Sequence, residues 1–287
     1  CQALLRHGTR KVVATDRSEL ALFELEQDPV WARAAADGCA VARLADITDA
    51  RQHAAIIDAH SVTDIIHTAA HKHVNFMEDA ALAAVENNVW GTRTLLEVAV
   101  AGGVRRFTFV STDKAVLPES VLGATKMWGE VLIAHFAQRQ AEGQGSGQEQ
   151  PCFSTIRLGN VLVSAGSVLD RFQAQIEQGG PVTVRDPSLE RYFITMPQAA
   201  ERILQAAQKA GNGQTYVAQM GAPLKILDLA RWSIQLAGHR PSLPGDAEGD
   251  IPVVFTALLA GEKLRETPLL PAEMHLYADG SGLITAE

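Results

Sequence analysis

Short apolar runs alternate with helical segments along the first half of this chain, and no other feature restricts its fold as strongly. Five runs read as buried strands, at Lys11–Thr15, Ala40–Leu44, Asp64–Ala70, Arg106–Ser111 and Thr155–Leu158. Between them lie stretches with helical periodicity, at Ser18–Glu26, Thr48–Ala59, Glu78–Ala101 and Val121–Gln140. Strands and helices that alternate in this way form βαβ units, so the sequence predicts an α/β fold around a doubly wound parallel sheet.

The pattern changes after Asn160. Shorter strand candidates follow, at Val182–Val184, Tyr192–Thr195, Thr215–Ala218 and Ile251–Phe255. We therefore predict a sheet domain over residues 1–158 and a smaller lobe over most of residues 159–287, from which some segments return to the sheet. The polar, glycine-rich stretch at residues 143–150 is predicted to be a surface loop.

The composition of the 287 residues excludes several classes of protein. The net charge is −8 and no basic run carries interleaved aromatic residues, which argues against a nucleic-acid-binding surface. No apolar stretch approaches the ~18 residues of a membrane span, so no membrane contact is expected within this chain. Cys1, Cys39 and Cys152 show neither disulfide nor metal spacing, and so few cysteines fit a reducing compartment such as the cytoplasm.

Thr112, Asp113 and Lys114 follow directly after the fourth predicted strand. Open parallel sheets hold their ligands at the edge where the strands end. An adjacent acid and amine at such an edge can act as a general acid and a general base, because burial favours a protonated carboxyl and a neutral lysine. Taken alone, the pair is equally compatible with a solvated turn.

Further motifs stand in a fixed order around this pair. They are AAHKHV at residues 69–74, NNVWGT at 87–92, STDKAV at 111–116, GATK at 123–126, GNVL at 159–162, GSV at 166–168, GGPVTV at 179–184, RYFIT at 191–195 and GEKL at 261–264. Together they resemble the polysaccharide-biosynthesis nucleotide-sugar 4,6-dehydratases of the UDP-N-acetylglucosamine 4,6-dehydratase type. These are extended short-chain dehydrogenase/reductase enzymes, and the resemblance covers nearly the whole chain.

The resemblance implies a fold, partners and a reaction. It implies a Rossmann-type domain that binds NAD or NADP, a C-terminal lobe that binds a UDP-sugar, and a homo-oligomer. In the implied reaction a hydride leaves C4 of the sugar, water is eliminated across C5 and C6, and the hydride returns to C6. Asp113 and Lys114 would be the acid and base of the elimination, and Thr112 would bind the reacting hydroxyl. Lys126 would bind the nicotinamide ribose.

Asp16 follows the first predicted strand, where an acidic residue typically contacts the adenosine ribose 2′-hydroxyl. Arg17 beside it could instead accept a 2′-phosphate, so the choice between NAD and NADP stays open. The alternative is a helix cap formed by the run from Asp16 to Glu19. The other cofactor positions that the resemblance implies are Asp46, Ile47, Ala69, Ala70, Lys72, Asn88 and Lys126.

A second set of positions is implied for the UDP-sugar. It comprises His73, Asn160, Val161, Ser167, Arg191 and Glu262. Arg191 suits a diphosphate because its guanidinium is planar and can donate two parallel hydrogen bonds, although a surface arginine at a strand start is the alternative. His67 and His71 lie close to His73 in sequence and suggest a metal site. Strand alternation turns His67 away from at least one of the others, so no metal is predicted.

The chain departs from the family at several single positions. Leu122 stands four residues before Lys126, where short-chain dehydrogenases carry a tyrosine that accepts a proton. Ala165 and Leu259 stand where arginines are usual, which weakens the expected attraction for UDP.

The beginning of the chain departs further. The first strand and the glycine-rich loop that cradles the cofactor diphosphate are not found ahead of Lys11–Thr15. The strand that is missing should lie between Lys11–Thr15 and Asp64–Ala70, so two strand edges should remain unpaired. We therefore expect the sequence to be a fragment of a longer protein, with poor affinity for NAD(P) by itself.

Two other functions fit the same residues. A nucleotide-sugar C4 or C5 epimerase shares the fold and the keto intermediate, although a simple C4 epimerase needs no leaving-group acid such as Asp113. A non-catalytic scaffold module would explain Leu122 and the missing glycine-rich loop.

Overall fold

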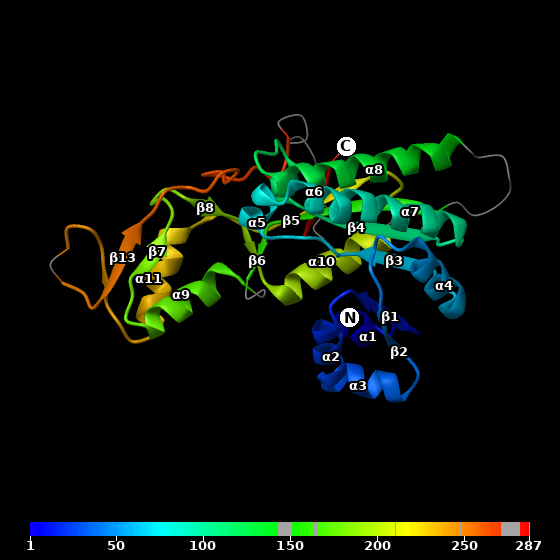
Figure 1. The fold of residues 1–287 in the computed structure, drawn as a ribbon, viewed down its shortest axis with the longest axis horizontal. Coiled ribbons are helices and arrows are strands. Elements are labelled where there is room, and N and C mark those ends of the chain that lie inside the picture. The colour runs from blue at the N-terminus through cyan, green and yellow to red at the C-terminus, as the bar shows by residue number, and fades with distance from the viewer. Residues whose placement is uncertain (143–150, 163–165, 210, 247, 271–281, 287) are drawn as a thin grey trace.

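A computed structural model describes residues 1–142, 151–162, 166–209, 211–246, 248–270 and 282–286 of the chain. Its centre is a five-stranded sheet with the order β14-β10-β5-β4-β3 (Figure 1). The four parallel strands are β3 (Asp64–His67), β4 (Arg106–Thr112), β5 (Cys152–Leu158) and β10 (Thr215–Ala218). The fifth strand, β14 (Leu283–Ala286), pairs antiparallel with β10 at the edge. The predicted α/β class is confirmed, and β14 is an addition that the sequence pattern did not indicate.

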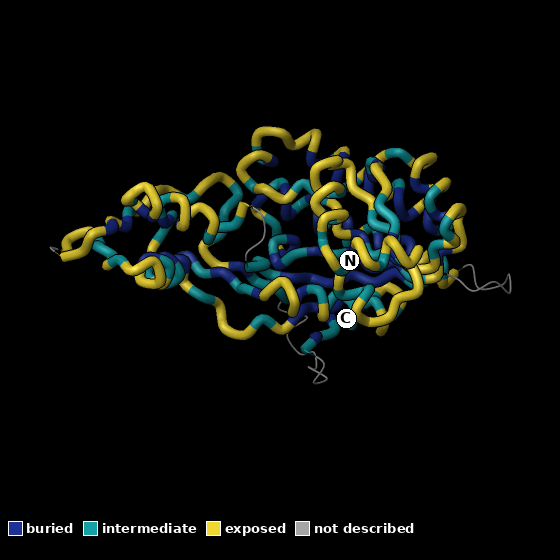
Figure 2. Tube along the Cα trace, turned by 90° about the horizontal axis from the view of Figure 1, so that it is seen from below, coloured by how far each residue is buried: buried dark blue, intermediate teal, exposed yellow. Residues whose placement is uncertain are grey.

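Helices cover both faces of this sheet (Figure 1). One face carries α4 (Ala50–His60), α7 (Gly91–Ala101) and α8 (Val121–Glu142), and the other carries α10 (Met196–Lys209). Phe107, Phe109 and Phe153 project from β4 and β5 into the core and are fully buried. Figure 2 shows the strands as a buried layer between more exposed helices. None of the described helices has the length and apolar character needed to cross a bilayer.

The predicted helix at Glu78–Ala101 is confirmed from Ala81 to Ala101, where α6 (Ala81–Val85), a π-helical turn at Glu86–Trp90 and α7 follow one another without a gap. Its first residues belong instead to a separate helix, α5 (Val74–Asp79). The break falls at Ala80, whose backbone leaves the helical region at φ −126° and ψ 49°. Glu78 accepts a hydrogen bond of 2.7 Å from the backbone N–H of Val121, which ties α5 to the beginning of α8. A tertiary contact therefore overrides a continuous run of helix-forming residues.

The predicted strand at Asp64–Ala70 is also too long, since β3 ends at His67. Beyond it the chain leaves the sheet and is held by Asn88. The Asn88 side chain accepts a hydrogen bond from the His71 backbone N–H at 2.8 Å and donates one to the His71 carbonyl at 3.1 Å. These hydrogen bonds satisfy backbone groups of His71 that a longer strand would pair with a neighbouring strand.

The first two strands form a unit of their own. β1 (Val12–Asp16) and β2 (Ala40–Leu44) make a two-stranded parallel sheet, packed with the helices α1 (Gln2–Arg6), α2 (Glu19–Gln27) and α3 (Pro29–Ala36). Trp31 fills the small core of this unit. Among the described residues, β1 pairs only with β2, and β3 pairs only with β4. The two unpaired edges predicted from the sequence are therefore present.

The smaller lobe is built from two separate stretches of chain. The first contains β6 (Asn160–Val161), α9 (Val168–Glu177), β7 (Val182–Val184) and β8 (Glu190–Arg191). The chain then runs through β9 (Phe193–Ile194) and α10 to β10 in the main sheet before it returns. The second stretch contains β11 (Leu224–Lys225), α11 (Ile226–Leu236), β12 (Pro241–Ser242) and β13 (Ile251–Phe255). Both stretches contribute to one core, in which Phe172, Ile234 and Val253 are buried.

Candidate active site

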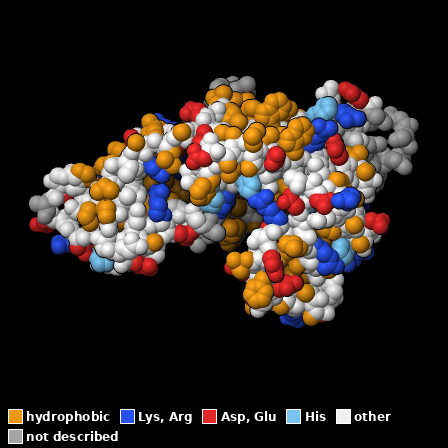
Figure 3. Space-filling view, viewed as in Figure 1, with side chains coloured by type: hydrophobic (Ala, Val, Ile, Leu, Met, Phe, Trp, Pro, Cys, Tyr) orange, Lys and Arg blue, Asp and Glu red, His pale blue; other side chains and the backbone are white. Residues whose placement is uncertain are grey.

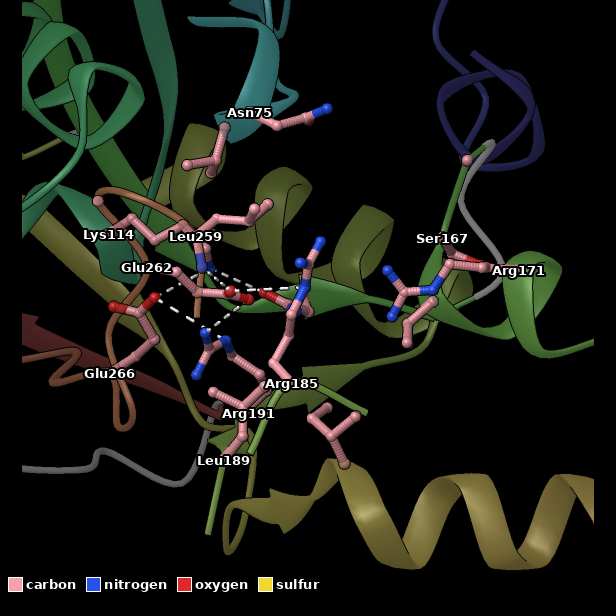
Figure 4. Close-up of a pocket in the computed structure, with 16 residues that line it drawn as sticks. Asn75, Lys114, Ser167, Arg171, Arg185, Leu189, Arg191, Leu259, Glu262 and Glu266 are labelled. Carbon is pink, nitrogen blue, oxygen red and sulfur yellow. Dashed lines mark hydrogen bonds and ion pairs between the residues drawn. The ribbon is translucent and has the colours of Figure 1, made fainter. Parts of the chain in front are cut away.

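A cavity of about 300 Å³ lies where the main sheet meets the lobe (Figures 3 and 4). The sheet side of its wall carries Lys114, and Asn160 of β6 lies at the junction with the lobe. The lobe side carries three arginines, Arg171, Arg185 and Arg191. Glu262 and Glu266 enter from the segment after β13, so basic groups and carboxylates from distant parts of the sequence share one space.

The turn after β4 fixes the predicted acid and base. β4 ends at Thr112, and a 3₁₀ turn follows at Asp113–Ala115. The Thr112 hydroxyl donates a hydrogen bond of 2.9 Å to Asp113 Oδ1 and accepts one of 3.4 Å from the Lys114 backbone N–H. Asp113 is fully buried, so the carboxyl is not in a solvated turn.

The amine of Lys114 is held by groups on three sides. Lys114 Nζ donates to Asp113 Oδ1 at 3.0 Å and to Asn160 Oδ1 at 2.8 Å, and lies 3.6 Å from Glu266 Oε1. Asp113 Oδ2 is buried and has no hydrogen-bond partner among the described residues. Lys114 lines the cavity and the Asp113 carboxyl is buried behind it, and a hydrogen-bonded amine and carboxyl of this kind can transfer protons to and from a bound molecule.

The arginines differ in how far their charges are compensated. Arg191 is 5% exposed, and its guanidinium lies 3.6 Å from Glu262 Oε1 and 4.0 Å from Glu266 Oε1. Arg185 Nε lies 3.9 Å from Glu262 Oε2. Among the described residues no carboxylate lies within ion-pairing distance of Arg171. Desolvation and the neighbouring charge of Arg185 lower the pKa of the Arg171 guanidinium, an effect that the charge of Glu262 partly offsets, so the clustered arginines at this end of the cavity favour an anion.

Lys126 does not line the cavity. It projects from α8 beneath the edge of the sheet, where its amine donates a hydrogen bond of 2.8 Å to the Val110 carbonyl and lies 4.5 Å from the centre of the Phe109 ring. Burial lowers the pKa of Lys126 to about 8, an effect that the charge of Glu130 partly offsets. Leu122, one turn earlier, is buried against Met77.

The residues predicted to bind adenosine lie in and next to the β1–β2 unit. Asp16 accepts a hydrogen bond of 2.8 Å from the Ser18 backbone N–H, and Ser18 is the N-cap of α2, since its hydroxyl accepts one of 3.2 Å from the Ala21 backbone N–H. Arg17 donates a hydrogen bond of 3.2 Å to Asn87 and lies 3.0 Å from His71 Nε2, which links the unit to the main domain. Asp46 accepts hydrogen bonds from the backbone and hydroxyl of Thr48, which lower its pKa.

The remaining predicted cofactor positions lie along the connection from β3 to α7. Ala69, Ala70 and Lys72 belong to the irregular segment before α5, and Asn88 is buried behind them. Ile47 is buried against Gly91, where an added Cβ would lie 2.6 Å from its side chain.

The three histidines of the sequence cluster have separate environments. His67 is buried and lies 2.9 Å from the Thr92 hydroxyl, and burial lowers its pKa to about 3. His71 contacts Arg17, as described above. His73 lies beside Gly166, where an added Cβ would be 3.0 Å from its ring. The described residues contain no group of three side chains arranged to hold a metal ion.

Among the predicted substrate positions, Asn160, Ser167, Arg191 and Glu262 line the cavity together with Lys114. Val161 lies in β6 and pairs with Ile194 of β9. Ser167 also caps α9, because its hydroxyl accepts a hydrogen bond from the Asp170 backbone N–H. Leu259 is on the cavity wall, whereas Ala165 and the predicted loop at residues 143–150 lie outside the described residues.

Sequence reasoning missed Arg171, Arg185 and Glu266. Arg185 directly follows β7, so a charged residue at a strand end was an available signal. Arg171 is one of several polar residues on the exposed side of α9, and Glu266 lies in an irregular segment. Neither position therefore stands out in the sequence as part of a site.

The chain matches the family model described as "Polysaccharide biosynthesis protein" over residues 1–286. It is 39% identical over 232 residues to "Capsular polysaccharide biosynthesis protein CapD" of Staphylococcus aureus, an alignment that covers 81% of this chain and 36% of CapD. The chain thus spans about a third of that relative. It is 33% identical over 239 residues to "UDP-glucose 4-epimerase" of Rickettsia rickettsii, covering 83% of this chain and 68% of that protein.

A further relative is "UDP-N-acetylglucosamine 4,6-dehydratase (inverting)" of Campylobacter jejuni, 26% identical over 274 residues, or 95% of this chain and 73% of that enzyme. Among solved structures, Pen from Bacillus thuringiensis superposes with a TM-score of 0.84 at 26% identity and covers 99% of this chain and 82% of its own. DesIV, a dTDP-glucose 4,6-dehydratase from Streptomyces venezuelae solved with NAD and DAU bound, gives 0.73 at 21% identity, covering 92% and 82%. The fold is that of the Rossmann-type extended short-chain dehydrogenases/reductases.

Proposed function

We propose that this chain, which belongs to the polysaccharide biosynthesis protein family, is a nucleotide-sugar 4,6-dehydratase that acts on a UDP-N-acetylhexosamine. The observation that carries the proposal is the position of Lys114, whose amine is hydrogen-bonded at 3.0 Å to the buried carboxyl of Asp113 and which lines a cavity whose lobe side carries arginines. This arrangement can bind an anionic nucleotide at one end and move protons at the other. The similarity to the Campylobacter jejuni dehydratase supports the same reaction.

We propose NAD or NADP as the cofactor, since similar structures are described with NAD bound. Asp16 and Arg17 at the end of β1 fit the adenosine ribose, and the buried amine of Lys126 fits the nicotinamide side. None of the described residues forms a glycine-rich turn leading from a strand into a helix beside β1, so no residue is assigned to the cofactor diphosphate. When bound, the cofactor would supply a hydride acceptor for C4 and a hydride donor for C6.

The chain's own groups would perform the elimination. We assign Lys114 as the base that removes the C5 proton, because its amine faces the cavity and is 17% exposed. We assign Asp113 as the acid that protonates the departing C6 hydroxyl, because its Oδ2 has no hydrogen-bond partner among the described residues; the carboxyl lies buried behind Lys114 and would have to turn toward the cavity to reach the hydroxyl. Asn160 and Thr112 would keep these two side chains in place through their hydrogen bonds.

The sugar nucleotide would bind across the lobe side of the cavity. Arg171 and Arg185 have the least compensated charges and are assigned to the diphosphate. Arg191 would act from behind them, because it is buried and shares Glu262 and Glu266. Ser167 and Glu262 line the same wall and are proposed to contact the remaining polar groups of the nucleotide.

An epimerase is the second candidate, because the Rickettsia rickettsii relative bears that name. The two reactions differ in their products: elimination yields a 4-keto sugar nucleotide that has lost one water, whereas epimerisation yields an isomer of unchanged mass. Incubation of the protein with UDP-N-acetylglucosamine and NAD or NADP, at cofactor concentrations raised until product formation no longer increases because weak cofactor affinity is expected, followed by mass spectrometry, distinguishes them. We expect the dehydrated product. An isomer would favour the epimerase, and no product with either cofactor would favour a non-catalytic scaffold.

A further inference from the structure

We infer that Glu266 is a positioning residue, which sets the amine of Lys114 and the guanidinium of Arg191 in place together through one carboxylate oxygen. Its role in a reaction rests on the dehydratase function proposed above, whereas its hold on Lys114 is a property of the folded chain. The predicted site did not include Glu266, which lies far along the sequence from both of the groups that it contacts.

Oxygen Oε1 of Glu266 joins the two sides of the cavity. It lies 3.6 Å from Lys114 Nζ, at the end of the main sheet, and 4.0 Å from Arg191 Nε, in β8 of the lobe (Figure 4). A displacement of this oxygen would therefore change the surroundings of Lys114, which is assigned to proton transfer, and of Arg191, which lies on the nucleotide side.

The environment of the carboxylate argues against a purely structural ion pair. The Glu266 side chain is 3% exposed, and such a buried charge is unfavourable unless cations and hydrogen bonds compensate it. Its second oxygen, Oε2, lies 3.7 Å from Lys263 Nζ but accepts no hydrogen bond from the described residues. Three cations surround the carboxylate, and none makes the short hydrogen bond that would maximise stability. The buried Oε2 thus retains acceptor capacity.

The segment that carries Glu266 is fixed on both sides. Before it, Lys263 donates a hydrogen bond of 2.7 Å to the Val116 carbonyl, and Leu264 accepts one of 3.0 Å from the Glu190 backbone N–H. After it, the Pro268 carbonyl accepts a hydrogen bond of 3.4 Å from Arg157. A charged group anchored in this way can hold a mobile lysine chain in one orientation.

The charged groups around Lys114 determine how a substitution of Glu266 would affect the Lys114 amine. Asp113 faces its amine from the same turn, Glu266 faces it from the later segment, and Arg191 and Lys263 stand behind Glu266. Glu266→Gln keeps the size of the side chain and removes its charge, so the Lys114 amine would be held only by Asp113 and Asn160. We expect this amine to become more reactive.

The test measures acetylation of individual lysines by sulfo-N-hydroxysuccinimide acetate, read by peptide mass spectrometry. We expect Glu266→Gln to raise the rate at Lys114 by about fivefold, the order expected for loss of one partly buried ion pair. Glu190→Gln is the matched control, since Glu190 pairs with Arg265 at 3.4 Å and does not line the cavity. An unchanged rate at Lys114 in Glu266→Gln, or an equal rise in Glu190→Gln, would overturn the inference.

The buried Lys126 serves as an internal reporter of unfolding, because its rate rises only if the domain opens. If Glu266→Gln opens the domain, Glu266→Asp decides instead: the shorter side chain retracts the charge from Lys114, so the Lys114 rate should exceed that of the wild type without labelling of Lys126. A wild-type rate in Glu266→Asp would then refute the inference.

Turnover separates this inference from the function on which it rests. Where the wild type forms the dehydrated product, Glu266→Gln should lower kcat by about tenfold and change KM less, as expected when a reacting group is misplaced. Equal losses in Glu266→Gln and Glu190→Gln would indicate a structural role and overturn the positioning role. Absence of wild-type turnover would refute the proposed function, and the acetylation rates would still decide whether Glu266 holds Lys114.

Discussion

The amine of Lys126 donates a hydrogen bond of 2.8 Å to the carbonyl oxygen of Val110, inside the domain and away from the cavity. Burial lowers the pKa of this lysine from 10.5 to about 8. The folded chain therefore releases the Lys126 proton at a lower pH than the unfolded chain does, and this difference couples stability to pH.

The first prediction follows from that coupling. Between pH 8 and 10.5 the unfolded chain binds a proton at Lys126 that the folded chain has lost, so this residue raises stability as the pH rises through that window. Below pH 8 Lys126 is protonated in the folded and in the unfolded chain. Burial of its charged amine then lowers the free energy of unfolding by the full amount. Relative to Lys126→Met, the wild type should gain on the order of 3 kcal/mol across the window. Urea denaturation at stepped pH measures both proteins, and a difference that stays constant with pH would contradict the burial of the charged amine.

The second prediction concerns the acid and base. Lys114→Met and Asp113→Asn should each lower kcat for the dehydrated product by about 100-fold or more, because each removes a proton-transfer group. The affinity for UDP should change little, since neither residue is assigned to the nucleotide. Lys225→Met, on an exposed residue of β11, is the control for a general loss of positive charge. Retention of elimination by Lys114→Met would show that another group is the base.

The third prediction concerns the nucleotide end of the cavity. Arg185→Met and Arg171→Met should each weaken UDP binding by about ten- to a hundredfold, because a charge-assisted pair with a phosphate is lost. Isothermal titration calorimetry with UDP measures the effect. Arg231→Met is the matched control, since Arg231 pairs with Asp228 on the outside of α11. Equal UDP affinities for all these variants would contradict the assignment of the diphosphate to Arg171 and Arg185.

The fourth prediction concerns Leu122, which stands where the resemblance to short-chain dehydrogenases implies a tyrosine. Leu122 is 6% exposed and packs with Met77 and Ala84. Leu122→Tyr adds volume and a hydroxyl to this cluster, so we expect it to lower the free energy of unfolding by about 1–3 kcal/mol. Leu122→Met keeps the volume and should cost less. Chemical denaturation compares the two, and a more stable Leu122→Tyr would indicate that space for a phenol is already present.

The sheet was predictable where hydrophobic pattern and local signals agree. The strands β1, β2 and β4 were recognised, to within a residue at each end, because each contains a short apolar run and polar residues follow within two positions of its end. The long predicted helix failed at Ala80, where no glycine or proline interrupts the sequence and the break depends on the contact between Glu78 and α8. Such a break cannot be read from local propensity.

The candidate site was predictable only in part for the same reason. Asp113 and Lys114 adjoin a strand and share motifs with a family, so both the chemistry and the location were available in the sequence. Glu266 enters the cavity from an irregular segment, and its significance depends on contacts with Lys114 and Arg191 that only the folded chain brings about. The two unpaired edges at β1 and β3 followed from the family resemblance, which implies a strand between them, whereas the separation of β1 and β2 into a sheet of their own was seen only in the structure.

The smaller lobe is assembled from two stretches of chain, with α10 and β10 between them in the sequence. Its interior mixes the two, because Phe172 comes from the first stretch and Ile234 and Val253 come from the second. A chimera made from two relatives with a single junction between the two stretches would combine core residues from different parents. Those residues have not been selected to pack against one another. Grafting substrate preference from one family member to another therefore requires both stretches to be exchanged at once, or point changes made within an intact lobe.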